Sequence, residues 1–73
     1  MSATIAGTRV RFQREALAQA KANGHKLWPT WMGDARVGEN RCRHCGYLVI
    51  VTVRSAGSAS IMGAAYSQRC PAK

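Results

Sequence analysis

The amino-acid sequence predicts a small α+β fold, in which an N-terminal helix is followed by a small antiparallel β-sheet. Residues 8–22 are rich in alanine and other good helix formers, which indicates a helix. Residues 47–54 are rich in β-branched side chains and indicate a strand. Between these segments, Cys42 and Cys45 belong to a Cys-x-x-Cys-Gly turn, which is typical of half a tetrahedral zinc site. We therefore expect one structural zinc ion in this fold.

The length of the chain favours an additional source of stability: disulfides, a metal or a partner. A chain of 73 residues buries too small a fraction of its surface to be held by a core alone. The longest apolar run, residues 47–51, is far shorter than a bilayer span, and residues 1–5 contain no apolar signal core. We expect a single cytoplasmic domain, in the host cytoplasm if a phage encodes it, with no membrane partner.

The predicted helix begins at Thr8, which can serve as the N-cap, and ends at Asn23-Gly24, a left-handed C-cap. Residues 1–7 are expected to form a disordered tail, residues 8–23 a basic helix, and residues 24–73 the metal-binding module. Arg11, Arg14 and Lys21 fall on one flank of the helix. This flank is either a solvated surface or a basic stripe that contacts phosphate.

The second half of the chain reads as strands separated by turns. An extended segment, residues 25–32, is interrupted by a proline, and its two tryptophans are expected in the core or on a contact surface. Turn signals at residues 33–34 and 38–40 flank a short strand, 35–37. The strand 47–54 is expected to be central and covered on both sides. A loop, 55–60, leads into a returning strand, 61–69, for which a helical turn over 62–67 is the alternative.

The expected zinc ligands are His25, Cys42, Cys45 and Cys70. An odd number of cysteines, three, argues against a closed set of disulfides. A hairpin that leaves Cys45 returns near it, which brings Cys70 to the site. His25 is preferred to His44 because a residue between two knuckle cysteines normally points outward. Four ligands form a closed site that can supply about 10 kcal/mol or more of folding free energy.

Other interpretations of these residues stay open at this point. The Cys-x-x-Cys pair can serve as a redox dithiol, although that chemistry favours a helix after the first cysteine rather than a strand. Cys70 can instead be an unligated residue near a frayed tail. In that case His44 or water would be the fourth ligand.

The complete spacing of these residues resembles a small zinc ribbon. Residues 24–71 contain Gly-His, Trp, Cys-x-x-Cys-Gly, Ile-x-Gly and Cys-Pro in order, and are similar to short His-Cys-Cys-Cys zinc ribbons of actinobacteria and their phages. The resemblance implies one zinc ion, a three-stranded sheet and no catalysis. The basic N-terminal helix is a departure from the bare module.

The charge of the chain indicates an acidic partner. Eleven Lys and Arg against 3 Asp and Glu give a formal net charge of +8, and zinc held by three thiolates lowers it by only about one unit. We expect contacts to nucleic-acid backbone without base specificity. The alternative is a phage- or mobile-element-encoded adaptor or inhibitor that docks on an acidic protein surface within a host complex. Catalytic residues and a small-molecule substrate are not expected. The expected contact residues are Arg11, Arg14, Lys21, Lys26, Arg41, Arg43 and His44.

Overall fold

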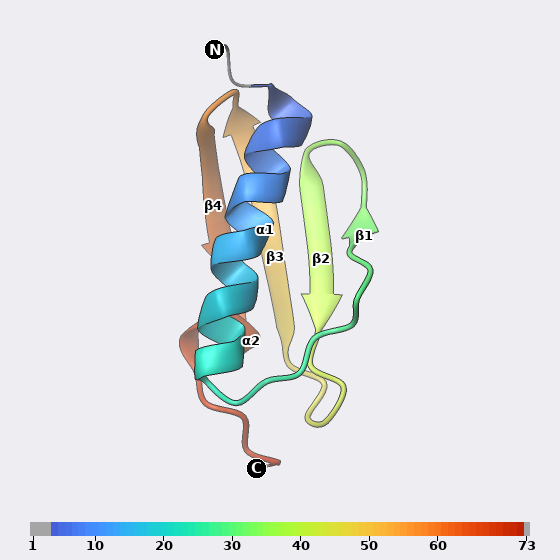
Figure 1. Cartoon of the computed structure of the whole chain (residues 1–73), viewed down its shortest axis with the longest axis vertical. Coiled ribbons are helices and arrows are strands. Elements are labelled where there is room, and N and C mark those ends of the chain that lie inside the picture. Colours follow the sequence, from blue (N-terminus) through green and yellow to red (C-terminus); the bar gives the residue numbers. More distant parts are fainter. Residues whose placement is uncertain (1–3, 73) are drawn as a thin grey trace.

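The computed structural model describes residues 4–72, which form two helices and a four-stranded antiparallel sheet (Figure 1). The strands follow one another in the order β1-β2-β3-β4, so each one pairs with its neighbour in the sequence. The long helix lies across one face of this sheet. The elements are α1 (Ile5–Ala22), β1 (Met32–Gly33), β2 (Val37–Arg41), β3 (Leu48–Ser55), β4 (Ser58–Met62) and α2 (Ala64–Ser67).

Helix α1 begins one turn earlier than the sequence predicts. The hydroxyl of Thr4 accepts a hydrogen bond from the Gly7 N–H at 2.9 Å, so Thr4 is the N-cap. Thr8 is buried within the helix, and its hydroxyl accepts a hydrogen bond from the Gly57 N–H at 2.6 Å. The expected disordered tail is therefore wrong for residues 4–7, and residues 1–3 lie outside the described part of the chain.

The C-terminal end of α1 confirms the predicted cap. Gly24 has a φ of 85°, in the left-handed region, and its N–H donates to the Lys21 carbonyl at 3.0 Å. The next N–H, of His25, donates to the Ala20 carbonyl at 2.9 Å. These two bonds form a Schellman motif, which turns the chain sharply at the helix end. The motif fixes the position from which the His25 side chain projects.

The sheet has four strands, whereas the resemblance implied three. Residues 38–40 were expected to form a turn but pair with β3 along the middle of β2, and the other edge of β2 pairs with the two-residue strand β1. Gly38 lies against the side chain of Gln13 from α1, where a Cβ atom would collide with it. Asn40 is buried and anchors the backbone of Trp28. Both turn-forming residues are thus used for long-range packing that a local pattern does not reveal.

The turn lies at residues 34–36, so the turn predicted at Gly33-Asp34 is confirmed only at Asp34, because Gly33 belongs to β1. The strand predicted over 35–37 is wrong except at Val37, where β2 begins. The Asp34 carboxylate accepts hydrogen bonds from the Arg36 and Val37 N–H groups at 2.9 and 3.0 Å. These bonds lower the pKa of Asp34 below its ordinary value because they favour the ionised carboxylate. The turn joins the short strand β1 to β2.

Strand β3 is central in the sheet but is covered on one side. Val49, Val51 and Val53 face α1 and are buried, as the alternation predicts. On the opposite face, Leu48 is exposed and Ile50 is partly exposed, so the expected cover on both sides is wrong. The sheet is antiparallel, and an antiparallel sheet can leave one face open to water.

The segment after β3 is shorter and tighter than expected. Residues 56–57 make the turn, β4 follows at once, and the helical alternative for 62–67 is confirmed by α2. The N-cap of α2 is Gly63, whose φ is 117°. Among residues 4–72, no helix is both long enough and apolar enough to cross a membrane.

The core lies between α1 and the sheet and is made largely of small side chains. Its partly buried margin includes Trp31, whereas Trp28 is half exposed. The two tryptophans thus divide between the two expected roles. The buried cluster consists of Ala16, Ala20, Leu27, Val49, Val51 and Ala65.

Candidate metal centre

The turn between β2 and β3 holds two cysteines. Cys42 directly follows β2, and its N–H donates to the Tyr47 carbonyl at 2.9 Å. The Cys42 carbonyl accepts a hydrogen bond from the Gly46 N–H at 3.0 Å, which closes the turn. Gly46 has a φ of 78°, a conformation that favours glycine. The chain therefore reverses within a few residues and presents both thiols at one end of the sheet.

The other two members come from the ends of the helices. His25 follows α1, and Cys70 follows α2. The Cys70 N–H donates to the Asn23 carbonyl at 2.8 Å, and the Asn23 side-chain amide donates to the Tyr66 carbonyl at 2.9 Å. These bonds tie the segment that carries Cys70 to the C-terminal end of α1.

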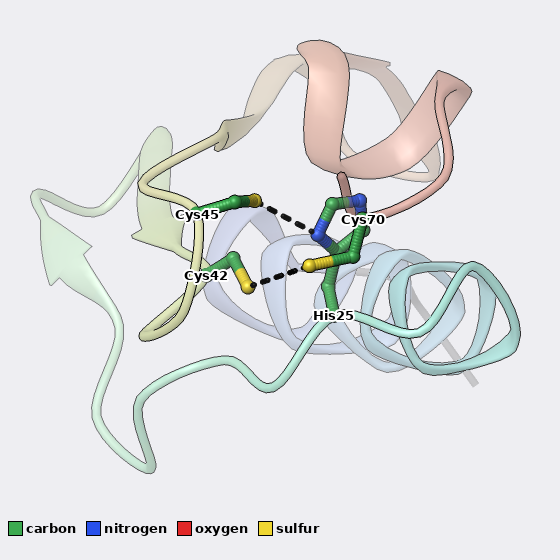
Figure 2. Close-up of side chains that lie close together, drawn as sticks. All are labelled: His25, Cys42, Cys45 and Cys70. Atoms are coloured by element: carbon green, nitrogen blue, oxygen red, sulfur yellow. Dashed lines mark hydrogen bonds between the residues drawn. The ribbon is translucent and has the colours of Figure 1, made fainter. Parts of the chain in front are cut away.

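The side chains of His25, Cys42, Cys45 and Cys70 converge, and their ligand atoms all lie within 4.8 Å of one another (Figure 2). The Cys42 and Cys70 Sγ atoms are 3.8 Å apart, and Cys45 Sγ is 3.5 Å from His25 Nδ1. Zinc bonds of about 2.3 Å to sulfur and about 2.0 Å to nitrogen give tetrahedral edges of about 3.8 and about 3.5 Å. These two separations therefore match the edges of a tetrahedral metal site, and the remaining ligand atoms lie close enough to join the same site.

The imidazole of His25 is oriented by a backbone group. His25 Nε2 lies 2.7 Å from the Gln68 carbonyl oxygen, which can only accept a hydrogen bond. The proton is therefore on Nε2, and Nδ1 presents its lone pair to the three sulfur atoms. Metal-bound histidines typically have such a partner on the second nitrogen. The sequence did not indicate Gln68, because its contribution is a carbonyl that any residue would supply.

The surroundings of Cys42 and Cys45 shift the pKa values of their thiols in opposite directions. Burial disfavours the Cys42 thiolate, but hydrogen bonds from the Lys26, Cys45 and His44 backbone outweigh it and lower the pKa of Cys42 to about 5. Burial, together with the neighbouring thiols, raises the pKa of Cys45 above its ordinary value. Cys42 is therefore a thiolate at neutral pH before any metal binds, whereas Cys45 keeps its proton.

The two histidines of the chain differ in their burial and in their position relative to the cluster. His25 is buried within the cluster, as the sequence favoured. His44 is exposed and outside it, and only its N–H reaches the Cys42 sulfur, at 3.4 Å. Cys70 is buried in the cluster rather than free on a frayed tail. The four residues can thus hold a metal ion.

The expected contact residues divide into two groups. Lys21, Lys26, Arg43 and His44 line one open hollow of about 640 Å³, which also borders His25 and Cys70. Arg41 lines a neighbouring hollow. Arg11 and Arg14 are exposed on α1, about 15 and 10 Å along the helix axis from Lys21, and do not line either hollow. Lys21, Lys26 and Arg43 therefore share one surface beside the cluster, Arg41 lies at the neighbouring hollow, and the two helix arginines are separate from both.

The sequence and the structure were also compared with known proteins. No family model, no curated protein and no solved structure matches the chain. The metal centre and its surroundings are therefore interpreted from their own geometry and chemistry.

Proposed function

We propose that this chain is a zinc-ribbon type of binding module, in which one structural zinc ion holds the fold and the basic surface beside the zinc contacts nucleic-acid backbone without base specificity. The module acts in the cytoplasm, or in a host cytoplasm if a phage encodes it. The observation that supports it best is the juxtaposition of a four-ligand cluster and a hollow lined by Lys21, Lys26, Arg43 and His44.

Zinc is the metal that suits the donor set. Thiolates and imidazole in a tetrahedral arrangement favour zinc over the hard cations, which prefer oxygen. Four protein ligands leave no position for substrate, so the site is structural rather than catalytic. When bound, zinc cross-links segments that the chain's small core holds only weakly.

The hollow suits phosphate because its charged side chains have one sign. Three of its lining residues are Lys or Arg, and no Asp or Glu lines it. The chain as a whole has a formal net charge of +8, which attracts polyanions over a distance. Contacts of this kind release counterions, so the affinity falls steeply with salt.

The proposal is tested by binding to generic DNA and RNA at a series of salt concentrations. We expect micromolar or weaker binding that declines linearly on a double-logarithmic plot against salt. Replacing Lys26 and Arg43 together by Gln should reduce the slope by about two, whereas replacing Arg11 and Arg14 should reduce affinity less. Absence of binding to any nucleic acid at low salt would refute the proposed function.

A second function is favoured by the open face of the sheet. Met32 and Met62 are strongly exposed there, and Leu48 lies on the same face. An adaptor or inhibitor from a phage or mobile element would use this face to dock on a host protein. Recovery of one stoichiometric protein after nuclease treatment, lost on Met32→Lys and Met62→Lys, would favour this function over nucleic-acid binding.

A further inference from the structure

Two short segments beside the metal centre form a ribbon with an outward row of cations and one indole. Leu27 and Cys42 form an isolated antiparallel bridge, and the Arg43 N–H donates to the Lys26 carbonyl at 2.8 Å. We refer to residues 26–28 and 41–43 as the 26–28/41–43 ribbon. Leu27 and Cys42 face inward and are buried. Because side chains alternate along extended segments, their neighbours face outward, and all of them are exposed: Lys26, Trp28, Arg41 and Arg43.

The backbone of the ribbon is fixed where the indole projects. The Trp28 N–H donates to Asn40 Oδ1 at 3.0 Å, and Asn40 Nδ2 donates to the Trp28 carbonyl at 2.9 Å. Asn40 is itself only 4% exposed. A buried amide therefore uses both of its ends to hold a residue whose own side chain is 50% exposed. This arrangement presents the indole to the outside instead of letting it pack into the core, where Trp31 lies.

The indole contacts a cation and also borders a hollow. The Arg43 guanidinium lies over the Trp28 ring, 5.0 Å from its centroid, on the side of the basic hollow. Trp28 also lines the second hollow, of about 590 Å³, together with Pro29, Met32 and Arg41. Its volume is within the range of about 300–1,000 Å³ that is usual for small-ligand sites. The ring thus meets positive charge at Arg43 and also borders a hollow whose lining includes Pro29 and Met32.

This combination fits an unpaired nucleotide better than a duplex. A base that stacks on an aromatic ring must be free of its neighbours, and stacking on such platforms tolerates any base. Cations beside the platform contact the phosphates on either side of the stacked base. Glu39 also lines the second hollow, where its carboxylate repels phosphate but can accept a hydrogen bond from an amino group of a base. A base in the second hollow would therefore meet Glu39, and its flanking phosphates would meet Arg41, which lines the same hollow, and Lys26 and Arg43, which line the basic one.

We propose that the 26–28/41–43 ribbon binds single-stranded nucleic acid, with one base stacked on Trp28 and the flanking phosphates contacted by Lys26, Arg41 and Arg43. This inference rests on the proposed nucleic-acid function and specifies the form of nucleic acid that is bound.

The test compares a labelled oligothymidylate with a duplex that carries the same number of phosphates, by fluorescence anisotropy. We expect the zinc-loaded protein to bind the single strand about tenfold more tightly or better. Trp28→Ala should remove most of this difference and leave duplex binding unchanged, and Trp28→Phe should retain it. Val10→Ala, which removes exposed methyl groups on α1, should change neither affinity. The zinc content of each variant verifies that it is folded.

A second measurement does not require loss of the indole. Trp31→Phe leaves Trp28 as the only tryptophan of the chain, so oligothymidylate should quench its fluorescence, and the duplex should quench it less. Equal affinities for the two forms, or an unchanged affinity in Trp28→Ala, would overturn the single-strand inference and leave the proposed function intact. Failure to bind either form would overturn both.

Discussion

At the scale of single residues, the two histidines differ in what surrounds them. His25 is buried, is oriented by the Gln68 carbonyl and lies 3.5 Å from the Cys45 sulfur, whereas His44 is exposed to solvent. The sequence could rank them because the Cys-x-x-Cys turn leaves His44 little room to point inward. It could not show the hydrogen bond that fixes the tautomer of His25, because that partner lies on a distant segment.

These surroundings predict a large difference between two alanine variants. His25→Ala should reduce zinc affinity by more than about 100-fold, because it removes a ligand and not merely a supporting group. His44→Ala should leave the affinity nearly unchanged, since only the backbone of His44 reaches the cluster. Competition with a chromophoric chelator measures both. Similar losses in the two variants would show that the ligand set is wrong.

The thiols predict how zinc affinity depends on pH. Cys42, with a pKa of about 5, needs no deprotonation at neutral pH, whereas Cys45, with its raised pKa, must release a proton when the metal binds. Zinc affinity should therefore rise at least about tenfold per pH unit across the neutral range. Below about pH 5, Cys42 also takes up a proton, so the dependence should steepen and the metal should dissociate. Titrations at several pH values measure the slope, and a flat profile near neutrality would contradict the assignment of Cys45.

At the scale of elements, the helix and the central strand followed from local patterns, but β2 did not. Alanine content and a left-handed cap define α1 well, and alternating valines define β3. In β2, Gly38 and Asn40 resemble turn residues, yet Gly38 makes room for Gln13 and Asn40 anchors Trp28. Both residues contact partners that are distant in the sequence, in α1 and in the 26–28/41–43 ribbon. The sequence of β2 alone therefore cannot show why they occur in a strand.

The backbone conformation at the junction between β4 and α2 requires glycine at position 63. Gly63 has a φ of 117°, and a Cβ atom there would collide with the backbone carbonyl of Leu48. Gly63→Ala should lower the free energy of unfolding of the zinc-loaded protein by about 1–3 kcal/mol or more. Chemical denaturation measures this change.

The control for that variant is Gly7→Ala in the first turn of α1. An added methyl group at Gly7 would approach only the Thr4 hydroxyl, and alanine is the better helix former. Its effect should stay within about 1 kcal/mol. If both variants had the same small effect, the tight junction at Gly63 would be refuted.

At the scale of the whole molecule, we expect stability to depend on metal bound at this centre because the core is small. Three of the six residues in the buried cluster are alanines, and alanine contributes little apolar area. The metal centre lies at one end of the molecule, where it would join the end of α1, the β2–β3 turn and the segment after α2 (Figure 1). At the other end, Thr8 bonds to the Gly57 turn.

Removal of zinc should therefore unfold most of the chain. We expect a chelator to abolish cooperative thermal unfolding and much of the far-ultraviolet circular dichroism, and added zinc to restore both. Cys70→Ala should behave like the chelated protein. A metal-free protein that melts cooperatively at the same temperature would show that the core is sufficient by itself.

The order of the ligands along the chain has a consequence for biosynthesis. Cys70 is separated by 28 residues from Cys42, and their sulfur atoms lie 3.8 Å apart in the cluster. A nascent polypeptide that already displays His25, Cys42 and Cys45 still has only three of its donors, and metal held by them would remain open to exchange. Translation must pass Cys70 before the site can close, so interrupted products would stay metal-labile and accessible to proteases. Only chains that have been synthesised beyond Cys70 could therefore hold the metal with all four ligands.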